Sequence, residues 1–260
     1  MVRVAVTGAT GRMGRELLST AGERDDVEVV LAASRSADEG AVVEGAAVDP
    51  AADLAALLVE REPNVLVDFT APASSVEYVA AAADAGVAAV VGTTGFDDEG
   101  LARLREAADD VAVLRAANFA RGVQALLGAV RAAVAALPDY DVEVTETHHS
   151  GKRDAPSGTA KTVLETVEAV REARGVPNGE RVHGREGEAP RSEGEIGVHA
   201  RRAGNVTGEH EVLLAGNHEA VRLTHRAESR GVFAAGALDA AAWLADRDPG
   251  WYGFDEVIEA

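Results

Sequence analysis

Short apolar runs alternate with helix-like segments over the first half of this chain, and this alternation restricts the fold more than any other feature. The apolar runs occupy residues 2–7, 27–33, 65–69, 87–91 and 111–114. Helix-like segments begin near Arg12 and occupy 74–85 and 97–108. Strands that alternate with helices form parallel βαβ units. The first half therefore predicts an α/β fold, a Rossmann-type doubly wound parallel sheet.

The pattern changes after Asn118. A helix-like segment at 122–137, a strand-like run at 140–147 and a polar loop precede a long helix at 159–174. Short alternating runs follow at 194–203, 209–215 and 219–226, and strand after strand predicts a mixed or antiparallel sheet. We expect an inserted α+β domain over about 120–219. The first domain then comprises 1–119 and about 220–260, with a last helix at 231–245 and an acidic tail.

Three glycines mark the turn after the first run. Gly8, Gly11 and Gly14 stand between that run and the helix that begins near Arg12. Glycine lets the backbone turn tightly, so that a pyrophosphate can approach the amide groups at a helix N-terminus. The spacing GxxGxxG departs from the common GxGxxG, and such a turn could also serve packing alone. Its position between a first strand and a helix nevertheless favours a dinucleotide site.

The end of the second run indicates which dinucleotide is bound. An acidic residue there binds the ribose 2′-hydroxyl of NADH, whereas an arginine accommodates the 2′-phosphate of NADPH. The chain has Ser34, Arg35 and Ser36 at this place. We therefore expect NADPH as the preferred cofactor, with NADH as the second choice. The alternative is that Arg35 is an ordinary solvated arginine.

A dense polar segment follows the run at 140–147. It contains His148, His149 and Lys152, and the chain has only one other lysine, Lys161. Because His148 and His149 end a strand, we expect their side chains to point to opposite faces and to have different roles. Lys152 lies one short turn further, close enough for its ammonium to share a pocket with an imidazole.

The same segment ends in the start of a helix. Pro156 and Ser157 precede this helix, which leaves the amides of Gly158 and Thr159 at its positive end, where a carboxylate binds. An imidazole, an ammonium and a carboxylate site suit proton delivery to an anionic substrate during a reduction. A capped helix behind an ordinary surface loop is the alternative. We expect no metal, because adjacent histidines are poor ligand spacing and a lysine beside them repels a cation.

Composition restricts the partners. The chain has 44 acidic and 25 basic residues, a formal net charge of −19, which disfavours nucleic acid and anionic membranes. It has no cysteine, which excludes disulfides and thiolate metal sites. No apolar run approaches the ~18 residues of a membrane-spanning helix, and no leader pattern precedes the first run. We expect a cytoplasmic protein, and the acidic, lysine-poor composition predicts a halophilic one.

Four motifs occur in the order in which one enzyme family has them. They are GATGRMG at 8–14, GTTGF at 92–96, AANF at 116–119 and ETHHSGKRDAPSGTA at 146–160, and RAGNVTGEH at 202–210 is a weaker fifth. In these motifs the chain resembles the 4-hydroxy-tetrahydrodipicolinate reductase family over essentially its whole length. The resemblance implies that NADPH or NADH reduces 4-hydroxy-tetrahydrodipicolinate, a cyclic dicarboxylate, to tetrahydrodipicolinate in diaminopimelate and lysine biosynthesis.

The resemblance also implies a role for each matching position. The cofactor-binding positions are Gly8, Ala9, Thr10, Gly11, Arg12 and Met13 at the pyrophosphate, Ser34 and Arg35 at the adenosine ribose, and Gly92, Thr93, Thr94, Ala116, Ala117, Asn118 and Phe119 at the nicotinamide. The catalytic positions are His148, as general acid/base, and Lys152, as a second proton donor. The substrate-binding positions are His149, Gly158 and Thr159. The loop at 148–159 is then expected to face the glycine turn.

Two positions depart from the family. Ser34 stands where the family has an acidic residue, which puts NADH use in doubt, and Ala71 stands where the family often has a basic one. The resemblance also implies a homotetramer formed through the sheet of the second domain, which binds the substrate. Two other functions stay open: a nucleotide-binding regulatory module without turnover, and a dehydrogenase that acts on an aspartate-derived or hydroxy-acid substrate.

Overall fold

The computed structural model describes residues 1–38 and 40–259. The chain divides into two compact units, Met1–Ala120 with Arg230–Ala260 and the intervening Arg121–Ser229. Of the helices in the described residues, none combines the length and the apolar character that a membrane crossing requires.

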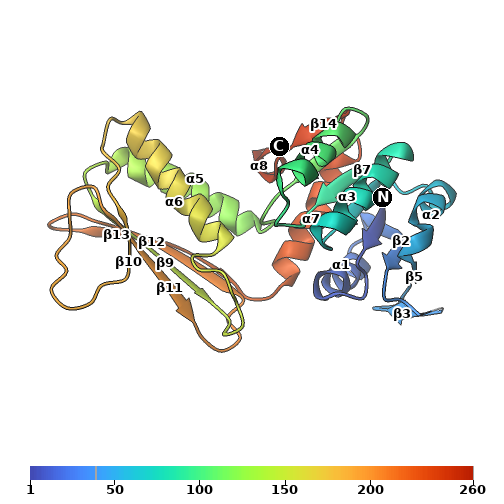
Figure 1. Ribbon diagram of the computed structural model, residues 1–260, viewed down its shortest axis with the longest axis horizontal. Helices are drawn as coiled ribbons and strands as arrows, with labels where there is room; N and C mark the ends of the chain where they lie inside the picture. Colours follow the sequence, from blue (N-terminus) through green and yellow to red (C-terminus); the bar gives the residue numbers. More distant parts are fainter. Residues whose placement is uncertain (39, 260) are drawn as a thin grey trace. The chain divides into compact units, whose positions relative to one another are not determined.

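The first unit is built on a seven-stranded sheet whose strands all pair in parallel, in the order β14-β8-β7-β6-β1-β2-β5 (Figure 1). The strands are β1 (Val2–Thr7), β2 (Val27–Ser34), β5 (Asp49–Pro50), β6 (Val65–Asp68), β7 (Ala88–Val91), β8 (Ala112–Arg115) and β14 (Gly250–Tyr252). The residues of β6 and β7 are all buried. Continuous apolar runs of this kind are typical of parallel strands that helices cover on both faces.

Helices cover both faces of this sheet. On one face α1 (Arg12–Gly22) packs against α7 (Gly231–Leu244), and their leucines share a core with Val4 and Val6 of β1. The other face carries α2 (Leu54–Arg61), α3 (Pro72–Asp84) and α4 (Asp98–Ala107), and Ala5 of β1 lies in a core on this side. Short elements near β2 and β5 are β3 (Val42–Val43), β4 (Ala46–Ala47) and η1 (Ala51–Asp53).

The strand order reverses at β1, which lies between β6 and β2. In doubly wound sheets, ligands bind at the carboxyl ends of the strands where the order reverses. The residues that follow β1 and β6 therefore stand at the expected ligand edge of this unit.

The second unit has a five-stranded mixed sheet in the order β10-β11-β9-β12-β13. Its strands are β9 (Asp141–His148), β10 (Arg181–His183), β11 (Ile196–Arg202), β12 (Gly208–Ala215) and β13 (Ala220–Ala227). The central strand β9 pairs in parallel with β11 and antiparallel with β12. Two helices, α5 (Arg121–Ala136) and α6 (Gly158–Ala173), lie side by side against one face of this sheet (Figure 1). Val142, Val144 and Glu146 are the buried positions of β9.

The predicted fold class is confirmed, and the strands and helices named from the sequence lie within a few residues of their expected places. One prediction is wrong: the end of the chain is no acidic tail. β14 extends the sheet beside β8, and α8 (Phe254–Glu259) buries Phe254 to 2% exposure. The aromatic residues Trp251, Tyr252 and Phe254 supply apolar surface there, and the acidic Asp255 and Glu256 stand in the first turn of α8, where the helix dipole favours them.

The chain returns to the first unit later than the expected position near 220. Residues of β13 pair with β12 along its whole length, so 220–227 belong to the mixed sheet, and the second unit ends at Ser229. Exposed and partly buried residues alternate along β13 because successive side chains of a strand point to opposite faces of the sheet.

Candidate functional site

The glycine turn joins β1 to α1 at the ligand edge of the first unit. Gly8 has φ +68, and a Cβ on Gly14 would lie 2.2 Å from the carbonyl oxygen of Gly8, so both positions require glycine. The amide of Ala9 donates to Ala33 and that of Gly11 to Gly8. No side chain caps α1. Arg12 and Met13 stand in the first turn of α1, where backbone amides have no partner within the helix and can bind an anion.

Three hydroxyl groups gather at the end of β2. The Thr10 Oγ1 atom lies 2.6 Å from Ser34 Oγ and 2.9 Å from Ser36 Oγ. Ser34 is buried, whereas Arg35 beside it is exposed. The strand end thus offers neutral hydroxyls and a guanidinium, donors that suit a phosphate.

Asp68 joins three loops at this edge. Its carboxylate is fully buried and accepts hydrogen bonds from Thr7 Oγ1 at 2.6 Å, Thr70 Oγ1 at 2.7 Å and Thr93 Oγ1 at 2.7 Å. These threonines end β1, follow β6 and follow β7, so one carboxylate holds the glycine turn and the GTTGF loop together. The hydroxyl of Thr93 is thereby engaged within the protein, and Thr94 next to it is exposed.

The AANF loop follows β8. Phe119 is 1% exposed, and its ring packs between those of Phe69, at 5.4 Å, and Phe254, at 5.1 Å. The Asn118 side chain accepts from the amide of Ala120 at 2.8 Å. Phe119 therefore anchors the loop in the core, and Ala117 is its exposed residue.

In the second unit, Glu146 and His148 share one side of β9 because they are two residues apart. His148 Nδ1 lies 2.6 Å from Glu146 Oε2, and Arg202 binds the same carboxylate with both terminal nitrogens, at 2.7 Å and 2.8 Å. A Cβ on Gly208 would lie 3.2 Å from His148 Nε2, so the glycine leaves space beside this second nitrogen. His149 lies outside the strand, after its last residue.

The start of α6 is tied to the same cluster. The Ser157 hydroxyl caps the helix by accepting from the amide of Ala160 at 3.2 Å, and it lies 3.1 Å from His210 Nε2. The amide of Ser157 donates to Glu146 Oε1 at 3.1 Å. Gly158 is exposed in the first turn, and nothing would crowd a Cβ there. The positive end of α6, a helix of 16 residues, thus lies beside His210.

Lys152 lies in the loop that joins β9 to α6. Its ammonium forms an ion pair with Asp154 at 2.9 Å, and its amide donates to the carbonyl of His149 at 3.1 Å. The ammonium is near enough to His148 to lower the pKa of that imidazole. The structure therefore brings His148, Lys152 and the start of α6 into one cluster, which His149 joins through its backbone carbonyl.

Burial sets the protonation of the cluster. It lowers the pKa of His148, and the carboxylate of Glu146 opposes this effect. Burial by itself would raise the pKa of Glu146, but hydrogen bonds from Arg202 and His148 keep this pKa below its ordinary value. Burial, with help from His148 and His225, lowers the pKa of His210 to about 4. At neutral pH the cluster therefore contains an ionised Glu146 and a neutral His210.

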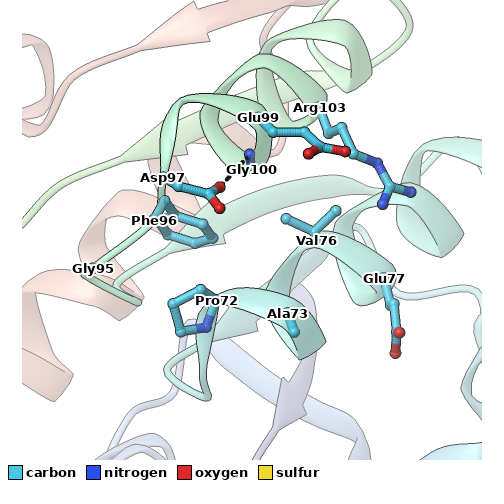
Figure 2. Close-up of a pocket in the computed structure, with 10 residues that line it drawn as sticks. All are labelled: Pro72, Ala73, Val76, Glu77, Gly95, Phe96, Asp97, Glu99, Gly100 and Arg103. Carbon is cyan, nitrogen blue, oxygen red and sulfur yellow. Dashed lines mark hydrogen bonds between the residues drawn. The ribbon is translucent and has the colours of Figure 1, made fainter.

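A separate pocket of about 350 Å³ opens between the starts of α3 and α4 (Figure 2). Three carboxylates and one guanidinium line it, from Glu77, Asp97, Glu99 and Arg103. Asp97 caps α4 by accepting from the amide of Gly100 at 2.8 Å. The excess of negative charge makes this pocket a poor place for a phosphate or a dicarboxylate.

The sequence motifs by themselves assign no role to Glu146, Arg202, His210 or Asp68. The first three lie within the motifs at 146–160 and 202–210, and the strand register explains why those motifs belong together. Arg202 is opposite His148 in the β11–β9 pair, and His210 is opposite Glu146 in the β12–β9 pair. Asp68 ends a buried strand, and a carboxylate at the end of an apolar run was the only signal for it.

Two family models match the chain in succession. "Dihydrodipicolinate reductase, N-terminus" matches residues 2–119, and "Dihydrodipicolinate reductase, C-terminus" matches 122–258. Together they include the glycine turn, the GTTGF and AANF loops and the histidine–lysine cluster.

Individual proteins agree with these models. A 4-hydroxy-tetrahydrodipicolinate reductase from Natronomonas pharaonis is 54% identical over 99% of this chain and 100% of its own length. One from Haloarcula marismortui is 51% identical, with 100% of both chains covered. Among solved structures, the dipicolinate-bound dihydrodipicolinate reductase from Paenisporosarcina sp. TG-14 is 28% identical and has a TM-score of 0.78, over 98% of this chain and 99% of that one.

Proposed function

This chain belongs to the dihydrodipicolinate reductase family, also named 4-hydroxy-tetrahydrodipicolinate reductases, and from that membership we propose which of its residues carry the reaction. The chain is an oxidoreductase that reduces 4-hydroxy-tetrahydrodipicolinate with a pyridine nucleotide in diaminopimelate and lysine biosynthesis. The resemblance seen in the sequence motifs is confirmed. The single observation that carries the assignment of roles is the cluster of His148, Lys152 and the start of α6.

The first unit holds the cofactor in this proposal. The turn at 8–13 forms the pyrophosphate site. The tight backbone excludes a Cβ at Gly8 and Gly14, and no side chain caps the first amides of α1, so a phosphate can approach them. Gly92, Thr93 and Thr94, with 116–119, form the nicotinamide end. The buried contacts of Thr93 and Phe119 support a role for these two in shaping the loops, which leaves Thr94 and Ala117 as the exposed contacts.

The second unit holds the substrate. One carboxylate of the cyclic dicarboxylate binds the amides of Gly158 and Thr159 at the positive end of α6. His149 is a further contact, and Lys152 adds a positive charge that complements the dianion. Ser157 and Glu146 fix the first turn of α6, which supports a rigid carboxylate site.

The net reaction adds one hydride and one proton and removes the 4-hydroxyl group as water. The reduced nicotinamide supplies the hydride when it is bound. His148 Nε2 delivers the proton, because Nδ1 is held by Glu146 and Gly208 leaves space at Nε2. Burial lowers the pKa of His148 in the free protein, and a dianionic substrate raises it again, so the imidazole becomes a proton donor as substrate binds. Lys152 is the second donor.

A coupled assay tests this function. A synthase generates the substrate in the assay, and NADPH oxidation is followed by absorbance. A reductase oxidises NADPH only when the substrate is generated. A regulatory module binds NADPH without turnover, and a dehydrogenase for another acid shows no dependence on the synthase; either result contradicts the assignment.

We propose NADPH as the preferred cofactor. The hydroxyls of Thr10, Ser34 and Ser36 with the exposed guanidinium of Arg35 support a 2′-phosphate at the end of β2. An acidic residue at position 34 would instead favour the two free ribose hydroxyls of NADH.

We also propose a homotetramer formed through the second unit. Its sheet has helices packed on one face only among the described residues, and the other face carries partly exposed residues such as Thr145, Glu211 and Leu213. Sedimentation analysis of the purified protein tests this, with a tetramer expected. A monomer at micromolar concentration would contradict it.

We place the enzyme in the cytoplasm of a salt-loving cell. Its reaction draws on the cellular pool of pyridine nucleotides, which supports the location. The net charge of −19, the presence of only two lysines and the haloarchaeal relatives support the habitat.

A further inference from the structure

Glu146 is the most enclosed charged group of the second unit's cluster. Its side chain is 1% exposed, and both carboxylate oxygens have two partners each. Oε2 accepts from His148 and Arg202, at 2.6 Å and 2.7 Å, and Oε1 accepts from Arg202 and the amide of Ser157, at 2.8 Å and 3.1 Å. A buried carboxylate is stable only when it is fully paired in this way.

We propose that Glu146 is a positioning residue for the reductase reaction: it selects the nitrogen of His148 that faces the substrate and holds that nitrogen in register with the first turn of α6. This inference rests on the proposed function, because it takes His148 as the proton donor. Neither Glu146 nor Arg202 needs to touch the substrate in this role.

The choice of nitrogen follows from the chemistry of the carboxylate. An ionised carboxylate only accepts hydrogen bonds, so His148 Nδ1 must carry a proton in both its neutral and its charged state. Nε2 is then the nitrogen that gains and loses the transferred proton. Arg202 keeps Glu146 ionised, since its two hydrogen bonds favour the charged form.

The second carboxylate oxygen of Glu146, Oε1, fixes the position of His148 relative to the first turn of α6. The amide of Ser157 donates to Glu146 Oε1, and the Ser157 hydroxyl caps α6 and meets His210 Nε2 at 3.1 Å. One rigid carboxylate therefore joins the proton donor to the helix end that binds the substrate carboxylate. A displacement of about 1 Å between reacting groups lowers the rate strongly, so the contacts that Glu146 makes with His148 and Ser157 affect the rate directly.

The charged and titratable groups around His148 come from four segments. Glu146 lies on β9 itself, Arg202 on β11, His210 on β12 and Lys152 in the loop before α6. Glu146 is the one carboxylate among the described residues that bonds His148 directly, whereas the next one, Asp154, pairs with Lys152 at 2.9 Å. Removing the charge of Glu146 therefore leaves the imidazolium of His148 without a directly bonded anion.

Glu146→Gln is the test, measured as kcat against pH. Glutamine keeps an oxygen for Ser157 but turns an N–H donor toward Nδ1, which moves the proton of neutral His148 to Nε2 and disfavours the imidazolium. We expect kcat to fall by about 10² to 10⁴, the range for loss of a general acid. The alkaline decline of kcat should begin about one pH unit lower or more, because a lost carboxylate partner shifts a pKa by that amount. The KM for substrate should change far less.

Glu143→Gln is the matched control. Glu143 lies three residues earlier on β9, and its Oε2 atom is 2.6 Å from His199 Nε2, a second carboxylate–histidine pair in the same sheet. This variant should keep the wild-type kcat and pH profile. Glu146→Asp, which retains the charge, should restore the alkaline decline to the wild-type position.

Two results would overturn the inference. One is a wild-type kcat in Glu146→Gln. The other is a fall in kcat with an unchanged pH profile, which indicates a merely structural role.

If Glu146→Gln fails to fold, ¹⁵N NMR of His148 in the wild-type protein decides. A neutral ring with its proton on Nδ1 supports the inference, and one with its proton on Nε2 overturns it. If His148→Gln itself keeps full kcat, the proposed function fails, whereas an inactive His148→Gln with normal Glu146→Gln rejects only this inference.

Discussion

At the scale of single residues, we propose that one side chain at the end of β2, Ser34, decides between two cofactors. Ser34 is buried, and its hydroxyl lies 2.6 Å from that of Thr10, so contacts within the protein fix its side chain. A glutamate there would repel a 2′-phosphate and accept from the two ribose hydroxyls of NADH.

Ser34→Glu should therefore lower the ratio of kcat/KM for NADPH to that for NADH by about tenfold or more, equivalent to about 1.4 kcal/mol. Steady-state kinetics with each cofactor measures this ratio. Ser19→Glu, at an exposed position of α1, is the control and should leave the ratio unchanged. An unchanged ratio in Ser34→Glu would remove the assignment of the 2′-phosphate site.

The cluster around His148 shows how far residue-level reading of the sequence reaches. His148, Lys152 and the start of α6 are close in the chain, so their proximity could be predicted from local spacing. Arg202 and His210 come from strands on either side of β9, and only the register of the sheet places them opposite His148 and Glu146. The sequence without this register therefore indicates no partner for the buried carboxylate of Glu146.

At the scale of elements, Asp68 links the ends of three strands in the first unit. Asp68 ends β6, and its carboxylate accepts from Thr7 at the end of β1 and from Thr93 after β7, at 2.6 Å and 2.7 Å. Hydrogen bonds to one carboxylate therefore link the glycine turn to the GTTGF loop. A pyridine nucleotide contacts both in the proposed site.

Asp68→Asn should weaken NADPH binding about tenfold, because the amide replaces one acceptor oxygen by a donor that faces a hydroxyl, a change of about 1–2 kcal/mol. Calorimetric titration of NADPH in the absence of substrate measures this. Asp84→Asn at the exposed end of α3 is the control. Unchanged NADPH affinity in Asp68→Asn would show that the three loops hold their places without the carboxylate.

Most elements of the first unit could be predicted because strand and helix periodicity is strong in apolar parallel strands. The end of the chain could not, since its acidic composition conceals three aromatic residues and because β14 is only three residues long. Its place is set by the free edge of β8 and by the contact of Phe254 with Phe119, at 5.1 Å. Neither partner is local in the sequence.

At the scale of the whole molecule, the net charge of −19 sets the response to salt. Like charges on the surface repel one another and destabilise the compact state, and this repulsion is screened over about 10 Å at 0.1 M salt and about 3 Å at 1 M. The folded protein should therefore gain stability as salt rises.

The midpoint of thermal unfolding should rise between 0.1 M and 2 M KCl, by about 2–4 °C for each kcal/mol of relieved repulsion. Differential scanning calorimetry measures it. Replacing the exposed carboxylates of Asp25, Glu99 and Glu188 with their amides should reduce the rise. A midpoint that is flat or falls with KCl would contradict the halophilic interpretation.

The most direct test of the account is one variant measured in two ways. His148→Gln should lower kcat by about 10² to 10⁴ in the synthase-coupled assay, while the dissociation constant of NADPH stays at its wild-type value, because in the proposed function the histidine acts on the substrate and the first unit binds the cofactor. A variant that keeps full kcat, or one that loses NADPH affinity in step with its activity, would contradict the proposed division of labour between the two units.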